Sequence, residues 1–330
     1  MSRDRALRFL RINETQLAPD SGCHKLAKVK RPDEEEATIA IRTAQLLRVP
    51  APFDLARTTA PVWWARGRWP NVDWRNGAFY WVGWEAGRTV WRSARQVDAR
   101  TLEISGNRAC DLDPEWSASV LGTNAEMPNF DDPVLEALAS QHPGLKPWSA
   151  GSLFEGVVSS IVGQSISVAA AATTERRLFE LFNDGIDIDG RRYWPAPRPA
   201  QLATSSAEQI RTSGVTSKRA EALVAVGSLF DTATVGDPGL PQASPHVGGD
   251  VLLAVSGIGP WTVRSALLWG IGEADAHPTG DVALLRAARK HYSHVATLKD
   301  LDRLSEQWKP SRGWAARLLW LDLLGFDDHG

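Results

Sequence analysis

The spacing of hydrophobic residues divides the chain into a shorter part with β character and a longer helical part. Between Pro50 and about Leu121, short aromatic and branched runs, such as 78–82 and 89–91, alternate with glycine-containing turns. This pattern is typical of strands. The segments FDLARTT, GAFYWVGWEAGRTVWRS and RTLEIS therefore predict an antiparallel sheet.

From Asp131 onward, hydrophobic residues recur at steps of three and four, most clearly over 154–169, which predicts amphipathic helices. Residues 232–249 are rich in glycine, proline and serine and are expected to form a loop. We therefore predict an α+β fold with three parts: a flexible segment over 1–45, an antiparallel β domain over 46–125, and an all-α domain over 126–330.

A tight turn in the helical part, within 251–270, is suited to binding phosphate. Gly257 follows a short apolar run, where a helix can end in a left-handed residue without steric cost. Gly259 and Pro260 open a new helix, because proline is tolerated at the first helical position. The N–H groups of that first turn have no internal acceptor, so they can bind an anion.

Asp281 lies a short loop beyond this turn and precedes the apolar positions of another helix. An aspartate there is most simply a helix N-cap. A cap also holds its carboxylate in place, which is compatible with a chemical role.

Charge and composition narrow the class of protein. The 330 residues include 37 basic and 39 acidic side chains, a balance that counts mildly against a dedicated non-specific DNA binder. Local contacts can still bind DNA, and Lys218 and Arg312 are candidates.

The sequence has no long apolar run for a membrane span, and its charged start lacks the apolar core of a signal peptide, so we expect a cytoplasmic protein, nucleoid-associated when bound to DNA.

The turn, the loop and the C-terminal segment together resemble one known family. The string VSGIGPWT is followed at family spacing by Gly270, Gly272, Asp275, Pro278 and Gly280-Asp281, and the C-terminal WKPSR segment leads to Trp320. These residues are similar to those of the helix-hairpin-helix DNA glycosylases, and most similar to the AlkA-type 3-methyladenine glycosylases. The resemblance covers roughly 131–330, and 50–121 only in general texture.

The resemblance implies a role for each matching residue. Asp281 would be the catalytic carboxylate, and Trp261, Trp320 and Ser265 would line the base pocket. Ser165 stands where relatives carry the side chain that wedges into DNA, and Ser265 and His277 depart from the family pattern. DNA contacts are implied for Gly257, Ile258, Gly259, Thr262, Gln164, Ser165, Lys218 and Arg312, and backbone carbonyls of Leu253, Val255 and Ile258 would hold a structural monovalent cation.

The implied activity is hydrolysis of the N-glycosidic bond of alkylated bases, of the 3-methyladenine or 7-methylguanine type, in double-stranded DNA. Bifunctional relatives carry a lysine after the second hairpin glycine, whereas this chain has Pro260-Trp261, so we expect no strong lyase activity. No required cofactor is expected, and two cysteines cannot build a four-cysteine iron–sulfur cluster. Open alternatives are excision of deaminated or oxidised bases, and a non-catalytic DNA-binding protein; we expect a monomer.

Overall fold

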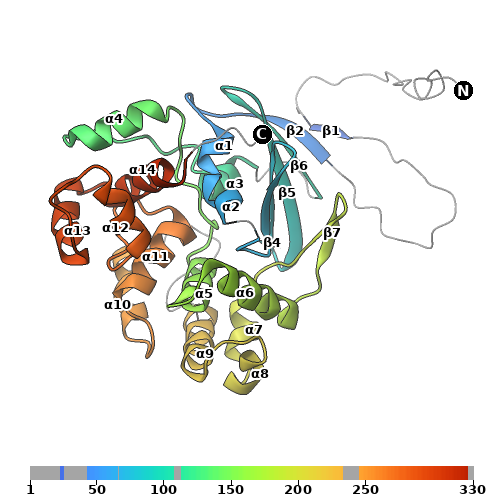
Figure 1. Ribbon diagram of the computed structural model, residues 1–330. Coiled ribbons are helices and arrows are strands. Elements are labelled where there is room, and N and C mark those ends of the chain that lie inside the picture. The colour runs from blue at the N-terminus through green and yellow to red at the C-terminus, as the bar shows by residue number, and fades with distance from the viewer. Residues whose placement is uncertain (1–22, 26–42, 66, 108–112, 233–244, 326–330) are drawn as a thin grey trace, which may run out of the picture.

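The computed structural model describes residues 23–25, 43–65, 67–107, 113–232 and 245–325. An antiparallel sheet forms one side of the molecule, and a helical domain packs beside and below it (Figure 1). This agrees with the predicted α+β class and with the predicted order of the two domains.

The sheet has six strands in the order β1-β2-β6-β5-β4-β3, and each neighbouring pair is antiparallel. Asn76 and Gly77, both with positive φ, form the two-residue turn between β3 and β4, a geometry that matches the twist of a hairpin. The strands are β1 (Cys23–Lys25), β2 (Thr43–Arg48), β3 (Val72–Arg75), β4 (Ala78–Glu85), β5 (Arg88–Asp98) and β6 (Thr101–Gly106).

One sequence-based expectation for this domain was wrong. The segment 53–59 is helical, because the Asp54 carboxylate accepts a hydrogen bond from Arg57 N and caps helix α1 (Leu55–Thr58). Within the segment expected to be flexible, Cys23–Lys25 pairs with β2, which itself begins at Thr43. The rest of that segment lies outside the described residues.

The remaining elements are mainly helices. Helix α10 starts at Pro245, inside the stretch expected to be a loop, and residues 233–244 of that stretch lie outside the described part. The elements are α2 (Ala60–Trp64), α3 (Asp113–Val120), α4 (Pro133–Gln141), α5 (Leu153–Gly163), α6 (Val168–Phe182), β7 (Ile186–Ile188), β8 (Arg191–Tyr193), α7 (Pro199–Ala203), α8 (Ala207–Arg211), α9 (Ser217–Asp231), α10 (Pro245–Leu253), α11 (Pro260–Ile271), α12 (Val282–Arg289), α13 (Leu298–Ser305), the short 3-10 helix η3 (Glu306–Trp308) and α14 (Arg312–Leu324).

Helices α5 and α11 cross at two glycines. A Cβ atom added to Gly156 would lie 2.5 Å from the Cα of Gly270 and 2.6 Å from the carbonyl oxygen of Ala266. Such distances are far inside van der Waals contact, so a side chain at either glycine would push the helices apart. This crossing places α11 in the centre of the helical core, whose buried residues come from most of the helices.

Buried polar contacts join the sheet to the helical domain. Arg68, from the loop before β3, pairs with Glu175 of α6, which is only 1% exposed. Asn71 donates a hydrogen bond of 3.0 Å to Glu155 in the first turn of α5. Trp269 packs against the hydrophobic clusters of both domains. Breaking a buried ion pair is costly, so these contacts hold the two domains in one arrangement.

A search of the described helices for one that combines the length and hydrophobicity of a membrane span finds none.

The glycine crossing leads to a stability prediction. Gly156→Ala should lower the free energy of unfolding by about 1–3 kcal/mol, because an overpacked core must shift its backbone. The matched control is Gly249→Ala in α10, where the added Cβ meets only Val263 at 3.6 Å; this change should be neutral or stabilising, since alanine favours helix. Chemical denaturation of both variants tests this, and an equal effect of the two would contradict it.

Glu155 leads to a prediction on pH. Burial raises the pKa of Glu155 from 4.5 to about 7, although the hydrogen bond from Asn71 acts in the opposite direction. The folded protein therefore keeps a proton that the unfolded chain releases, so the free energy of unfolding falls as pH rises from 4.5 to about 7.

Glu155→Gln keeps an oxygen that can accept the Asn71 hydrogen bond but carries no charge. We expect this variant to be more stable than the wild type above pH 7 and to show a flatter pH dependence between pH 4.5 and 7. Denaturation at several pH values measures this. Glu221→Gln, at an exposed position on α9, serves as the control; identical curves for the wild type and Glu155→Gln would refute the prediction.

Candidate active site

The turn between α10 and α11 has the geometry expected of a phosphate-binding hairpin. Gly257 has φ of 91°, a left-handed conformation that favours glycine. Gly259 is the N-cap of α11 and Pro260 is its first residue, with no side-chain cap on the first-turn N–H groups. These N–H groups lack acceptors within the helix and can bind an anion. Ile258 is buried beneath the turn and anchors it to the core.

Side chains from α9 and from the α5–α6 loop contact this hairpin. Gln164 Nε2 donates to the Gly257 carbonyl at 3.0 Å and to Thr262 Oγ1 at 2.8 Å. The Arg219 guanidinium in turn donates to the Gln164 carbonyl. Lys218 is exposed and its side chain lies beside Gly257, so its ammonium group can reach a phosphate bound at the turn.

The loop after Gln164 projects from the same region. Ser165 is exposed and has φ of 52°, a left-handed conformation that is uncommon for a residue other than glycine. Ile166 and Val168, which follow it, are also exposed hydrophobic residues. The structure thus places Gln164 against the hairpin and Ser165 in the exposed loop that follows it.

Asp281 is the N-cap of α12. Its Oδ1 accepts a hydrogen bond of 2.7 Å from Leu284 N, and its backbone N–H donates to the Pro278 carbonyl at 3.1 Å. Within the described residues, Oδ2 has no hydrogen-bond partner. Asp281 is half-buried, so one oxygen is fixed by the helix while the other can face a substrate.

Two side-chain contacts hold the loop that ends at Asp281. Arg312 binds Asp275 in a bidentate manner, with Nε at 2.9 Å from Oδ1 and Nη2 at 2.6 Å from Oδ2. His277 is buried and its Nε2 lies 3.0 Å from Asp302 Oδ1. Burial lowers the pKa of His277, and Asp302 partly opposes this effect. Arg312 therefore braces this loop in the structure, and its expected contact with DNA stays a prediction.

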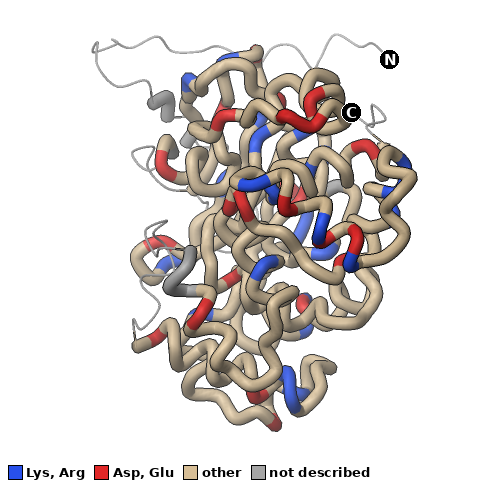
Figure 2. The backbone as a smooth tube through the Cα atoms, turned by 90° about the vertical axis from the view of Figure 1, so that its left-hand side faces the viewer, with Lys and Arg blue, Asp and Glu red and all other residues tan. Residues whose placement is uncertain are grey.

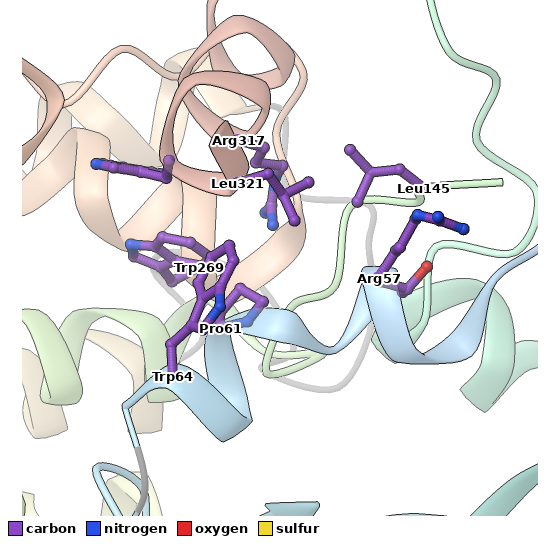
Figure 3. A pocket seen from close by; sticks show the side chains of 9 residues that line it. Arg57, Pro61, Trp64, Leu145, Trp269, Arg317 and Leu321 are labelled. Atoms are coloured by element: carbon purple, nitrogen blue, oxygen red, sulfur yellow. The ribbon is translucent and has the colours of Figure 1, made fainter. Parts of the chain in front are cut away.

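A pocket lies between the two domains, near the C-terminal end of α11 (Figure 3). Its aromatic wall is formed by Trp269 and Trp320, whose rings are stacked with centroids 5.4 Å apart. The Arg317 guanidinium lies over the Trp269 ring, 4.8 Å from its centroid, and donates to the Leu268 carbonyl at 2.7 Å. Helices α1 and α2 contribute Arg57, Pro61 and Trp64 to the opposite side.

Of the three residues expected to line a base pocket, this pocket contains Trp320 but not Trp261 or Ser265. Trp261, Ser265 and Trp269 stand four residues apart, so they share one face of α11. Ser265 is buried and small, between the two tryptophans on that face. The pocket is therefore a continuation of the predicted face, one turn beyond Ser265.

Sequence reasoning missed Trp269, Arg317 and the residues from α1 and α2. The four-residue spacing from Trp261 could have identified Trp269. Arg317 carried no signal, because its burial depends on where α14 packs against α11. Residues of α1 and α2 reach the pocket only through the arrangement of the two domains.

The carbonyl groups predicted to hold a cation lie where a helix ends. Leu253 is the last residue of α10, and the C-terminal carbonyls of a helix lack intrahelical donors. The Val255 carbonyl accepts one hydrogen bond, from Ile258 N at 3.1 Å, which leaves its second lone pair available. This set of oxygen donors is chemically suited to a hard cation.

Basic and acidic residues are intermingled along the described chain (Figure 2). Two of the basic side chains are already paired: Lys290 lies 2.7 Å from Asp322, and Arg312, a candidate DNA contact, contacts both Asp275 and Glu306. Lys218 makes no such ion pair within the described residues. Any DNA contact would thus depend on the hairpin N–H groups and on a small number of local cations.

Comparisons with known proteins place this geometry in context. No model of a known protein family matches the chain. The DNA-3-methyladenine glycosylase of Bacillus subtilis is 25% identical over 191 residues, which cover 57% of this chain and 63% of that protein. DNA-3-methyladenine glycosylase 2 of Escherichia coli is 31% identical over 199 residues, covering 58% of this chain and 66% of that protein. The chain thus spans slightly less than two thirds of each of these relatives.

The fold is also that of a solved glycosylase structure. The 3-methyladenine DNA-glycosylase from Archaeoglobus fulgidus superposes with a TM-score of 0.69 and 18% identity, over 84% of this chain and 97% of that one. Two relatives matched in sequence and one matched in structure are thus all named as 3-methyladenine glycosylases. The chain is thus similar in sequence to DNA-3-methyladenine glycosylases and shares the fold of one of them, in agreement with its resemblance to AlkA-type glycosylases of the helix-hairpin-helix superfamily.

Proposed function

We propose that this protein is a monofunctional DNA glycosylase that binds double-stranded DNA and excises alkylated bases. The observation that carries the proposal is Asp281, a carboxylate held by its own helix and by a braced loop that follows the hairpin helix. The relatives named for 3-methyladenine support this assignment.

The hairpin and Lys218 would bind the phosphate backbone, since backbone N–H groups and lysine position DNA without reading its sequence. The damaged nucleotide would then leave the base stack and enter the protein. The C1′–N bond breaks, the base keeps the electron pair, and positive charge develops on the sugar. The Asp281 carboxylate stabilises that charge and orients a water molecule, which adds to C1′ and releases a proton.

Two further parts belong to the same proposal. Trp261, where bifunctional relatives carry lysine, cannot form a Schiff base, so the abasic strand should remain intact. Leu253, Val255 and Ile258 would hold a monovalent cation through their carbonyl oxygens, and that cation would stiffen the hairpin.

The carboxylate can be tested directly. Asp281→Asn keeps the oxygen that accepts from Leu284 N and so should fold normally, but it loses the charge. We expect release of methylated bases from methylated duplex DNA to fall by about 100-fold or more, as for other groups that stabilise transition-state charge. Asp231→Asn, on exposed α9 surface, controls for the change in net charge. Full excision by Asp281→Asn would overturn the proposed role.

The hairpin can be tested through salt dependence. Lys218→Ala should weaken binding to undamaged and damaged duplexes alike, and should reduce the slope of log K against log salt by about 1, because one phosphate contact is lost. Arg88→Ala, at the exposed start of β5, is the matched control. Fluorescence anisotropy across a salt series measures both. Unchanged slopes for Lys218→Ala would exclude a phosphate contact by this residue.

A further inference from the structure

His277 is a buried polar side chain in the loop between α11 and α12. It is 3% exposed, and its Nε2 lies 3.0 Å from Oδ1 of Asp302 in α13. Its Nδ1 is also buried and has no hydrogen-bond partner in the described part of the chain. Burying a polar group is costly unless it is paired, so the contact with Asp302 is what stabilises a histidine at this position.

The contact requires an imidazole that donates from Nε2. An ionised carboxylate accepts hydrogen bonds and donates none, so Nε2 carries the proton and Nδ1 carries a lone pair. Burial lowers the pKa of His277, and the charge of Arg312 acts in the same direction. The carboxylates of Asp302 and Glu306 oppose this shift without cancelling it. The neutral ring is therefore the form present at neutral pH, and it serves as an uncharged N–H donor.

Two backbone hydrogen bonds connect His277 to Asp281. The His277 carbonyl accepts from Thr279 N at 2.8 Å, and the Pro278 carbonyl accepts from Asp281 N at 3.1 Å. Thr279 and Gly280 are exposed, and a Cβ atom added to Gly280 would meet no described atom within 4 Å. This short stretch therefore has little packing of its own, and its course depends on the anchors at its two ends, His277 and the cap of α12.

Asp302 attaches the loop to a helix that itself packs against the helix of Asp281. Helices α12 and α13 are in contact (Figure 1), so the contact between His277 and Asp302 closes a ring that runs through α13, α12 and the loop. Pro278 is also buried, but burial of apolar surface is non-directional. A hydrogen bond has a preferred direction, so the imidazole contact fixes the orientation of the loop as well as its depth.

We propose that His277, held by Asp302, is a positioning residue that keeps the free oxygen of the Asp281 carboxylate aligned with the sugar during excision. The inference rests on the proposed glycosylase function and adds to it a residue that does not touch the substrate. Such a residue acts on the rate of the chemical step, because a misplacement of about 1 Å can cost about 100-fold in rate. His277 lies outside the hairpin that would bind phosphate, so DNA affinity should depend little on it.

The test measures single-turnover excision of 7-methylguanine from duplex DNA by the full-length protein over a range of enzyme concentrations. His277→Leu removes both ring nitrogens and should lower the saturating rate constant by about 10- to 100-fold, with little change in the enzyme concentration that gives half of that rate. His277→Gln supplies an uncharged N–H donor and should retain most of the wild-type rate constant. A side chain that only filled space would give the opposite order, because leucine is the more apolar substitute.

A double-mutant cycle tests whether the two side chains act through one contact. Asp302→Ala should lower the rate constant about as much as His277→Leu, and the variant with both changes should be no slower than the slower single variant, because one shared interaction can be lost only once. The matched control is His291→Leu, since His291 Nε2 lies 2.9 Å from Asp322 Oδ2 beyond the other end of α12. This control should keep the wild-type rate constant.

The rate constant of a single turnover does not depend on how much of a variant is folded, whereas its amplitude does. A wild-type rate constant in His277→Leu would overturn the inference, and so would an equal loss in His291→Leu. Weaker DNA binding with an unchanged saturating rate would overturn it as well, because His277 would then act on binding. A wild type that releases no methylated base would contradict the proposed function itself, which is a separate outcome.

Discussion

The close crossing of α5 and α11 at Gly156 and Gly270 is the constraint on which the rest of the site depends. Backbone meets backbone there, so α11 can lie this close to α5 only with glycine at both positions. The N-terminal end of α11 carries the hairpin, and its C-terminal end carries Trp269. One packing contact thus determines both the place where phosphate can bind and the place of the pocket.

The contacts of the hairpin extend this arrangement. Gln164, at the end of α5, donates hydrogen bonds to the Gly257 carbonyl and to Thr262 of α11, which tie the α5–α6 loop to the hairpin. Gln164, which was expected to contact DNA, therefore also has a structural role. A backbone that must present several N–H groups to one phosphate benefits from such rigidity, because less freedom is lost on binding.

The loop that ends at Asp281 is held by a separate set of contacts. Arg312 and Asp275 tie it to the start of α14, and His277 and Asp302 tie it to α13. Asp281 itself adds the cap of α12. Helix α14 also carries Arg317 and Trp320. Through the Arg312–Asp275 contact, the loop that ends at Asp281 is therefore connected to the same helix that forms part of the pocket wall. The departures from the family pattern at Ser265 and His277 thus lie in different settings: Ser265 is a small buried side chain on α11, whereas His277 secures the loop.

Local signals in the sequence determined the elements that depend on neighbours in the chain. The Gly257–Gly259 turn, the cap at Asp281 and the order of a β domain before a helical domain follow from conformational preference and periodicity, and the structure has all three. The resemblance in sequence also indicated a similarity to AlkA-type DNA glycosylases, which the comparisons support. The helix at 55–58 was missed because its cap, Asp54, lies in a segment of strand-like composition.

Only the tertiary structure decided which side chains meet across the chain. The pocket combines residues from α1, α2, α11 and α14, which are far apart in sequence. Arg312 was expected to contact DNA, but it forms an ion pair with Asp275. Arg317 was not among the predicted site residues, but it is a buried cation that lines the pocket. Charge type is visible in a sequence, whereas burial and pairing depend on packing between distant helices, and these two properties decide what an arginine does.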